Sequence, residues 1–231
     1  DEKVTVDTGV VNAWMDRNSD LKAISGGGNI TAGSDSFGNY LNFDGSSNTW
    51  LNVTLPESAK TVIYVFRPEA MPFHYWSAVF GSSDDARFGT LLDHSTDDFH
   101  KSSGNSGYYP DAVWHNGEAL DAPFPLGYDV RAEITTIETN QHVPSNHKYR
   151  IGSLAANYPI KGDIYAVLVY NRKLNESDRL EVEKYLANKY HVYAEEATWL
   201  DSYNDLSFKN EVISKNRFNK NEADAAYAIK Q

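Results

Sequence analysis

The pattern of hydrophobic and polar positions is clearest late in the chain. Residues 163–170 form an almost wholly apolar run in which both alternating sets of positions are hydrophobic. Such a run predicts a strand buried on both faces. Residues 171–174 interrupt it, Asn175 can cap a helix, and Asp178 falls in the first turn. Over 176–190 the large apolar side chains gather on one helical face, which predicts a docked amphipathic helix. They are Val182, Tyr185, Leu186 and Tyr190.

Shorter runs rich in β-branched and aromatic residues predict strands in the preceding part of the chain. In one of them Tyr40 and Asn42 share a face opposite Leu41 and Phe43. In another, Asn116-Gly117 is a strong signal for a tight hairpin. The expected strands are 3–14, 40–45, 49–55, 60–69, 77–82, 87–93, 111–120, 130–139 and 148–154, with 77–82 and 87–93 joined as a hairpin.

Two segments carry turn-forming residues instead. Residues 21–41 are rich in Gly, Ser and Asn and predict a long surface loop, and 94–110 predict an irregular loop. About ten strands followed by one helix indicate an all-β, two-sheet sandwich over residues 1–193.

Residues 194–231 differ from the sandwich in composition. They contain no Gly or Pro, and their apolar residues do not keep to one helical face. They nevertheless hold too many large apolar groups for a disordered linker. We expect a helical or extended tail that docks on a partner surface, either the sandwich or another subunit. Another subunit is favoured because the sandwich motifs are already complete at Tyr193.

Composition excludes several classes of function. The net charge is −11, which disfavours nucleic acid and anionic membranes as partners. The chain has no cysteine, which excludes disulfides and thiolate metal sites. No apolar run is long enough to predict membrane insertion.

Six segments in order resemble the laminin-G-like, concanavalin A-like lectin and glucanase jelly-roll superfamily. The last is GDIYAVLVYNR followed by the helix ending in YLANKY, at 162–190. The others are VNAWMDRNSDLKAI (11–24), LNFDGSSNTWL (41–51), KTVIYVFRPE (60–69), VWHNGE (113–118) and YRIGS (149–153). The resemblance implies a jelly-roll fold that serves carbohydrate binding, adhesion, enzyme accessory and phage structural roles. Fold therefore does not fix function.

Catalytic signatures are incomplete. Related hydrolases carry an E-x-D-x-x-E string, which this chain lacks, and Glu133 and Glu138 fall on opposite faces of a regular strand. Related alginate lyases carry R-x-E-L and Q-I-H strands, which residues 131–134 and 141–143 imitate imperfectly. The seven histidines show no metal-ligand spacing and are expected in surface loops. We expect no enzymatic activity, with a polysaccharide lyase as an alternative.

Two kinds of ligand remain open. Acidic residues gather in and beside the predicted loops and suggest a Ca²⁺ site at Asp84, Asp85 and Asp93. Aromatic rings beside polar loops suit the stacking of sugar rings. The candidates for glycan contact are Tyr75, Trp76, Tyr108, Tyr109 and Asp111, whereas Trp114 is expected in the core.

The sequence therefore predicts a non-catalytic glycan-binding or adhesion module of a bacterial surface or phage particle protein. A cell-surface polysaccharide is the expected partner, with other protein subunits bound through 194–231. The location would be extracellular, on a cell surface or in a virion. A structural virion or filament subunit, such as a capsid decoration or tail component, is a further alternative.

Overall fold

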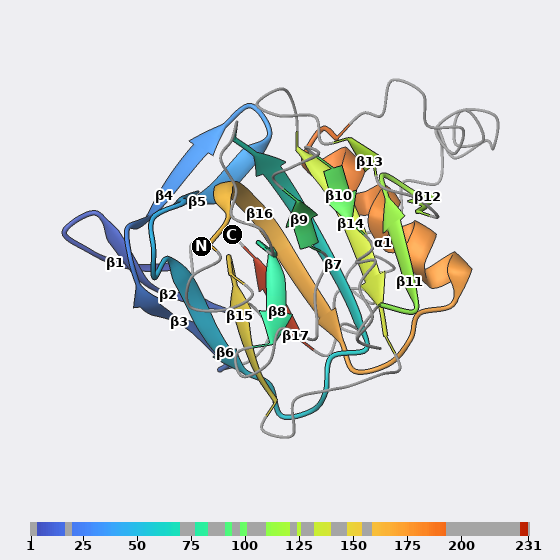
Figure 1. Cartoon of the computed structure of the whole chain (residues 1–231), viewed down its shortest axis with the longest axis horizontal. Coiled ribbons are helices and arrows are strands. Elements are labelled where there is room, and N and C mark those ends of the chain that lie inside the picture. Colours follow the sequence, from blue (N-terminus) through green and yellow to red (C-terminus); the bar gives the residue numbers. More distant parts are fainter. Residues whose placement is uncertain are drawn as a thin grey trace.

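The described residues form two antiparallel β-sheets, a small third sheet and one α-helix in a computed structural model (Figure 1). The predicted all-β sandwich with a late helix is thus confirmed. For 91–93, 98–100, 124–125 and 227–230 the strand pairing is described without side chains. The structure describes residues 4–16, 20–69, 77–82, 91–93, 98–100, 110–120, 124–125, 132–139, 147–153, 159–192 and 227–230.

The larger sheet has eight strands and is built around the apolar run identified in the sequence. Its order is β12-β11-β14-β7-β16-β5-β4, with β17 also paired to β16. Nine of the ten residues of β16 are buried, so its two faces contact two different layers. The strands are β4 (Ile30–Asp35), β5 (Gly38–Asp44), β7 (Thr61–Pro68), β11 (Ala112–His115), β12 (Glu118–Ala119), β14 (Glu133–Glu138), β16 (Lys161–Tyr170) and β17 (Tyr227–Lys230).

The second sheet has six strands in the order β1-β2-β3-β6-β15-β8, and a three-stranded sheet has the order β13-β10-β9. The six are β1 (Val4–Asp7), β2 (Val10–Met15), β3 (Lys22–Gly27), β6 (Trp50–Thr54), β8 (Phe80–Ser82) and β15 (Lys148–Ile151). The three are β9 (Leu91–Asp93), β10 (Asp98–His100) and β13 (Phe124–Pro125).

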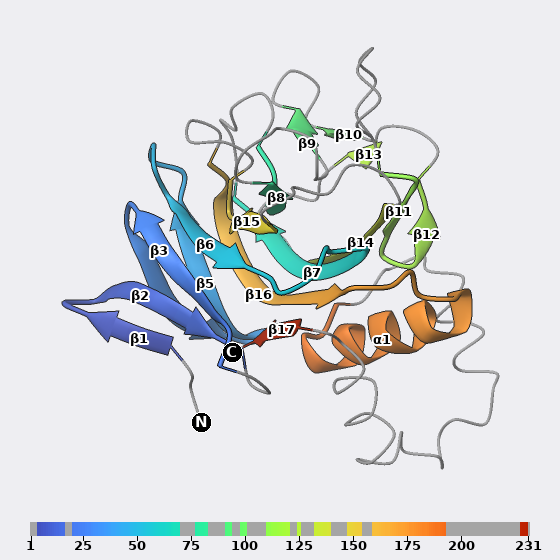
Figure 2. The ribbon, with the colours of Figure 1, turned by 90° about the horizontal axis from the view of Figure 1, so that it is seen from below.

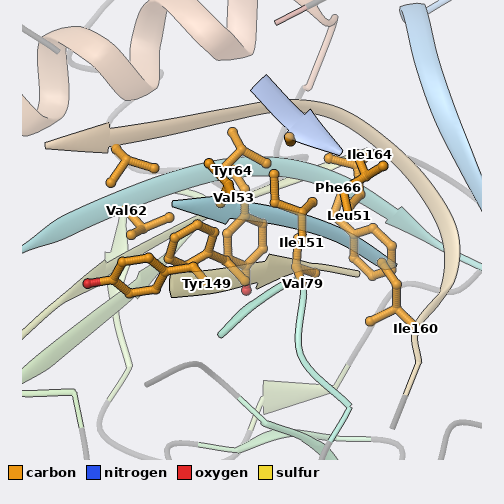
Figure 3. Close-up of a cluster of buried hydrophobic side chains, with 14 of the residues drawn as sticks. Leu51, Val53, Val62, Tyr64, Phe66, Val79, Tyr149, Ile151, Ile160 and Ile164 are labelled. Atoms are coloured by element: carbon orange, nitrogen blue, oxygen red, sulfur yellow. The ribbon is translucent and has the colours of Figure 1, made fainter. Parts of the chain in front are cut away.

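The main hydrophobic core lies between the two large sheets. Figure 3 shows Tyr64 and Phe66 of β7 pointing toward Val53 of β6 and Ile151 of β15. These four side chains are at most 2% exposed. Alternate residues of β7 enter this layer, and the others point to the opposite face of the sheet.

A second cluster covers the outer face of the eight-stranded sheet, where α1 (Glu176–Lys189) packs (Figure 2). Asn175 caps the helix as predicted, its side-chain oxygen accepting a hydrogen bond from the Asp178 N–H at 2.8 Å. The predicted docking face is confirmed, with Val182, Leu186 and Tyr190 buried. Trp114, expected in the core, is instead half-buried, with the Arg179 guanidinium 4.4 Å from its ring centroid.

The segment predicted as a long surface loop, 21–41, is mostly strand, and that prediction is wrong. It forms β3, β4 and the start of β5. Glycine there makes room for aromatic side chains. A Cβ on Gly26 would lie 2.0 Å from the Trp50 indole, and one on Gly33 would lie 2.5 Å from the Tyr40 ring. Packing between paired strands therefore overrode the local preference for a loop.

Three other local predictions need correction. The first strand, 3–14, is two strands joined by a turn, with Thr8 and Gly9 at positive φ. For the predicted hairpin of 77–82 with 87–93, the described residues show β8 paired with β15 and β9 paired with β10, and 83–90 lie outside them. The expected irregular loop 94–110 contains β10. The turn at Thr8-Gly9 and the pairing of β9 with the nearby β10 are local, whereas the pairing of β8 with β15 joins segments that no short window of sequence contains.

The end of the predicted tail pairs with the sandwich of its own chain. Residues 227–230 form β17 against Ala166–Val169 of β16, whereas 193–226 lie outside the described residues. The sandwich is therefore not complete at Tyr193, and the argument that favoured another subunit is wrong. No helix in the described part of the chain is long and apolar enough to cross a membrane.

Candidate functional site

Most of the site residues predicted from the sequence lie outside the described residues. For glycan contact these are the two aromatic pairs, Tyr75 with Trp76 and Tyr108 with Tyr109. For Ca²⁺ binding they are Asp84 and Asp85. Contact of the two aromatic pairs with a glycan therefore stays a prediction.

Two predicted residues do fall on or beside described elements. Asp93 ends β9, for which only the strand pairing is described. Asp111 precedes β11, and its carboxylate accepts a hydrogen bond from the Lys173 ammonium at 2.9 Å. Among the described residues, no group of three or more His, Asp or Glu side chains is arranged to hold a metal ion. The Ca²⁺ site therefore also stays a prediction.

The described neighbours of the two aromatic pairs lie at opposite ends of the sandwich. Ser77, which follows Trp76, donates a hydrogen bond to the Pro159 carbonyl just before β16. Asp111 pairs with Lys173 just after β16. The ten residues of β16 span about 33 Å. The described residues beside the two pairs, Ser77 and Asp111, are thus separated by about the length of β16.

The carboxylates considered for catalysis are separated by the sheet, as the sequence predicts. Glu133 lies on the inner face, where its Oε2 is 3.6 Å from Nε2 of His115. Glu138 lies on the outer face, which it shares with Thr136, a hydrogen-bond partner of Glu183 in α1. His115 is 2% exposed, so the expectation of a surface loop is wrong for this histidine.

Replacement of Glu138 should change how stability depends on pH. Burial raises the pKa of Glu138, so the folded protein holds this proton more tightly than the unfolded chain. The contribution of this group to stability is therefore present below its unfolded pKa and is lost as pH rises through the folded pKa. We expect Glu138→Gln to become more stable relative to the wild type as pH rises from about 4 to about 7. Urea unfolding across this range, with the exposed Glu176→Gln as control, checks the sign, and a constant difference would contradict it.

The described surface that best combines aromatic and polar groups is centred on Arg67. We define the Arg67 cluster as Asp35, Phe37, Tyr40, Asn42, Arg67, Glu69, Lys161 and Asp163. These residues come from β4, β5, β7 and β16 and the turns beside them, on the outer face of the sheet. Tyr165 connects the cluster to the end of α1, because its ring contacts both Tyr40 and Tyr190.

A buried carboxylate holds the cluster in place. Asp163 is 2% exposed and accepts hydrogen bonds from the Arg67 guanidinium, including one from Nε at 3.1 Å. It also accepts one from the Asn42 amide at 2.8 Å. Asp35 pairs with the same guanidinium at 2.8 Å and accepts a hydrogen bond from the Tyr165 hydroxyl. These bonds fix the side chains of the outer residues before any ligand arrives.

Several groups of the cluster reach the surface. Arg67 is 23% exposed, and its bonds to Asp35 and Asp163 use three of the five N–H donors of a guanidinium. Tyr40 and Phe37 are half-buried, and the Arg67 guanidinium lies 5.8 Å and 5.7 Å from their ring centroids. The cluster therefore presents donors and ring surface side by side on a rigid sheet.

The cluster is close to electrically balanced. Its three carboxylates, Asp35, Glu69 and Asp163, face two cations, Arg67 and Lys161, which leaves one net negative charge when all are ionised. Burial raises the pKa of Asp163, and the hydrogen bonds from Asn42 and Arg67 act in the opposite direction. Burial and the neighbouring carboxylates raise the pKa of Tyr40, which keeps its hydroxyl protonated at neutral pH. An uncharged ligand suits this balance better than an anionic one.

Part of this cluster was visible in the sequence. The alternation at 40–43 places Tyr40 and Asn42 on one face, as the structure confirms. The interpretation of 21–41 as a loop hid Asp35, which belongs to β4. Nothing in the sequence indicated that Arg67 and Asp163, 96 positions apart, would pair.

Comparison with known proteins places the chain in no family. No protein-family model and no curated protein matches it. Among solved structures it is similar to domain 4 of AbnA, a GH43 extracellular arabinanase from Geobacillus stearothermophilus, solved in complex with arabinotriose. That likeness covers 71% of this chain and 82% of the arabinanase domain, with 15% identity and a TM-score of 0.40. Values this low carry neither fold nor function across.

Proposed function

We propose that the protein is a non-catalytic glycan-binding module with a laminin-G-like, concanavalin A-like jelly roll, acting outside the cell on a bacterial surface or phage particle. The observation that carries the proposal is the Arg67 cluster, where half-buried rings and hydrogen-bonding groups share one rigid surface. The sequence resemblance of the last strand and helix supports the superfamily.

Saccharides fit the chemistry of this surface. Pyranose rings present apolar C–H faces to aromatic rings, and their hydroxyls exchange hydrogen bonds with planar polar side chains. Tyr40 and Phe37 supply rings, while Arg67 and Asn42 supply planar polar groups. Because the network is already formed, binding a sugar orders few side chains.

The charge balance favours neutral saccharides over uronates. The cluster carries a net negative charge, and the whole chain carries −11. A polyuronate would meet repulsion from both. This argument also disfavours the polysaccharide lyase alternative.

We expect a glycan array to reveal a neutral oligosaccharide ligand. Calorimetry with that ligand should show that Tyr40→Phe weakens its binding about 2- to 10-fold through loss of one hydrogen bond. Arg67→Lys should weaken it by about tenfold or more, because a lysine cannot reproduce the guanidinium fork. Tyr185→Phe and Arg172→Lys, which make the same changes on and beside α1, are the matched controls.

The outcomes separate the function from the site. An array without any bound glycan would contradict the proposed function. A glycan whose affinity is unchanged by both cluster variants would contradict the site alone. Release of reducing ends or of unsaturated uronate from a bound polysaccharide would contradict the non-catalytic assignment.

A further inference from the structure

The central strand β16 has one edge that its neighbours fill only in part. On one side β7 pairs with it from Gly162 to Tyr170. On the other side β5 pairs with it only from Lys161 to Ile164. The side chains of 164–170 are at most 1% exposed. Alternate residues of 166–169 direct their backbone N–H and C=O groups to this edge, and these groups need a further strand there.

The last strand of the chain fills this edge. β17 pairs antiparallel with β16, from Val169 opposite Tyr227 to Ala166 opposite Lys230 (Figure 2). Between Val192 and Tyr227 lie 34 residues, counted from 193 to 226. Fully extended, a connection of that length reaches about 110 Å. A folded domain of 231 residues has a radius of gyration of only about 17 Å. The covalent connection is thus long enough to reach the same edge on a neighbouring copy.

We propose that the edge of β16 that β17 fills also accepts β17 from a second copy of this chain, so that exchanged C-terminal strands join copies into an assembly. The contacts are the same within one chain and between two, so exchange sacrifices none of them. Addition of a terminal strand to an open sheet edge is a general mode of protein association. This inference does not depend on glycan binding.

Concentration decides between the two arrangements. A connection of 34 residues holds β17 near its own edge at an effective concentration of about millimolar or less, because the effective concentration falls as a connection lengthens. Exchange between copies competes once the protein approaches that concentration, as it does inside an assembly. The extent of exchange should therefore rise with protein concentration.

Cysteine pairs can test this directly, because the chain has none of its own. Ala166 and Lys230 are opposite each other. Opposed residues of antiparallel strands have Cα atoms about 4.5–5.5 Å apart, within the range for a disulfide. Full-length Ala166→Cys and Lys230→Cys variants are mixed, oxidised and separated without reductant. We expect a disulfide-linked heterodimer whose yield rises with concentration. Lys230→Cys mixed with Thr31→Cys, an exposed site on β4, measures random collisions.

The controls make every outcome informative. The double variant Ala166→Cys/Lys230→Cys should form a disulfide within one chain at micromolar concentration, and its failure to do so would overturn the assigned occupant. A heterodimer yield no higher than that of the Thr31→Cys mixture near millimolar concentration would overturn exchange. As a readout free of cysteine, Ala228→Pro/Ile229→Pro removes the N–H donor that one of these two adjacent residues directs to β16, and it should lower the dimer fraction of the full chain at high concentration. An unchanged fraction would also overturn the proposal.

Discussion

Leu186→Ala is expected to lower the free energy of unfolding by about 2–5 kcal/mol. Leu186 is 1% exposed and lies in the cluster that joins α1 to the outer face of the eight-stranded sheet, with Ile63 and Leu168. Removing its branched end leaves a cavity that the strands beneath cannot close without shifting. Urea unfolding followed by tryptophan fluorescence measures the change.

Ser177→Ala is the control for this experiment, because Ser177 is exposed on the same helix. It should change the free energy of unfolding by less than about 0.5 kcal/mol, the range of ordinary surface substitutions. A loss that small for Leu186→Ala as well would show that α1 is not docked on the sheet.

Glu183→Ala is expected to cost about 3–5 kcal/mol, because it leaves a buried cation without its partner. Arg179 and Glu183 lie on the buried face of α1, where Nη1 of Arg179 is 2.7 Å from Oε2 of Glu183. Glu183 also accepts a hydrogen bond from the Thr136 hydroxyl of β14. The loss should appear in urea unfolding at neutral pH.

A matched apolar replacement separates the contribution of the ion pair to stability from the contribution of side-chain packing. The triple variant Arg179→Met/Glu183→Leu/Thr136→Val removes both charges and the hydroxyl while keeping similar volumes. It should recover most of the stability lost in Glu183→Ala, because an apolar core can replace a buried ion pair at little cost. A triple variant no more stable than Glu183→Ala would contradict this account.

Features that depend on neighbours in sequence were predicted well. The apolar run became β16 and the capped amphipathic segment became α1, one residue shorter than expected. Asn116-Gly117 forms the predicted turn, with both residues at positive φ. The opposite placement of Glu133 and Glu138 followed from the two-residue period of a strand.

Features that depend on partners distant in sequence were not predicted from the sequence. His115 looked like a loop residue but is buried beside Glu133, because β11 pairs with β14. The proposed glycan surface joins residues of four strands, and only the pairing of β16 with β5 and β7 brings Asn42, Arg67 and Asp163 together.

The sequence by itself determined the sandwich class, its central strand and its docked helix, because hydrophobic periodicity and capping act over a few residues. Only the tertiary structure decided that 21–41 are strands, since the rings of Trp50 and Tyr40 lie against glycines whose own propensity favours a loop. The tertiary structure also decided the place of residues 227–230. The pairing of β5 with β16 ends at Ile164, and this leaves the edge of β16 that residues 227–230 fill. Strand pairing joins segments far apart in the chain, and a local pattern specifies a strand without specifying its partner.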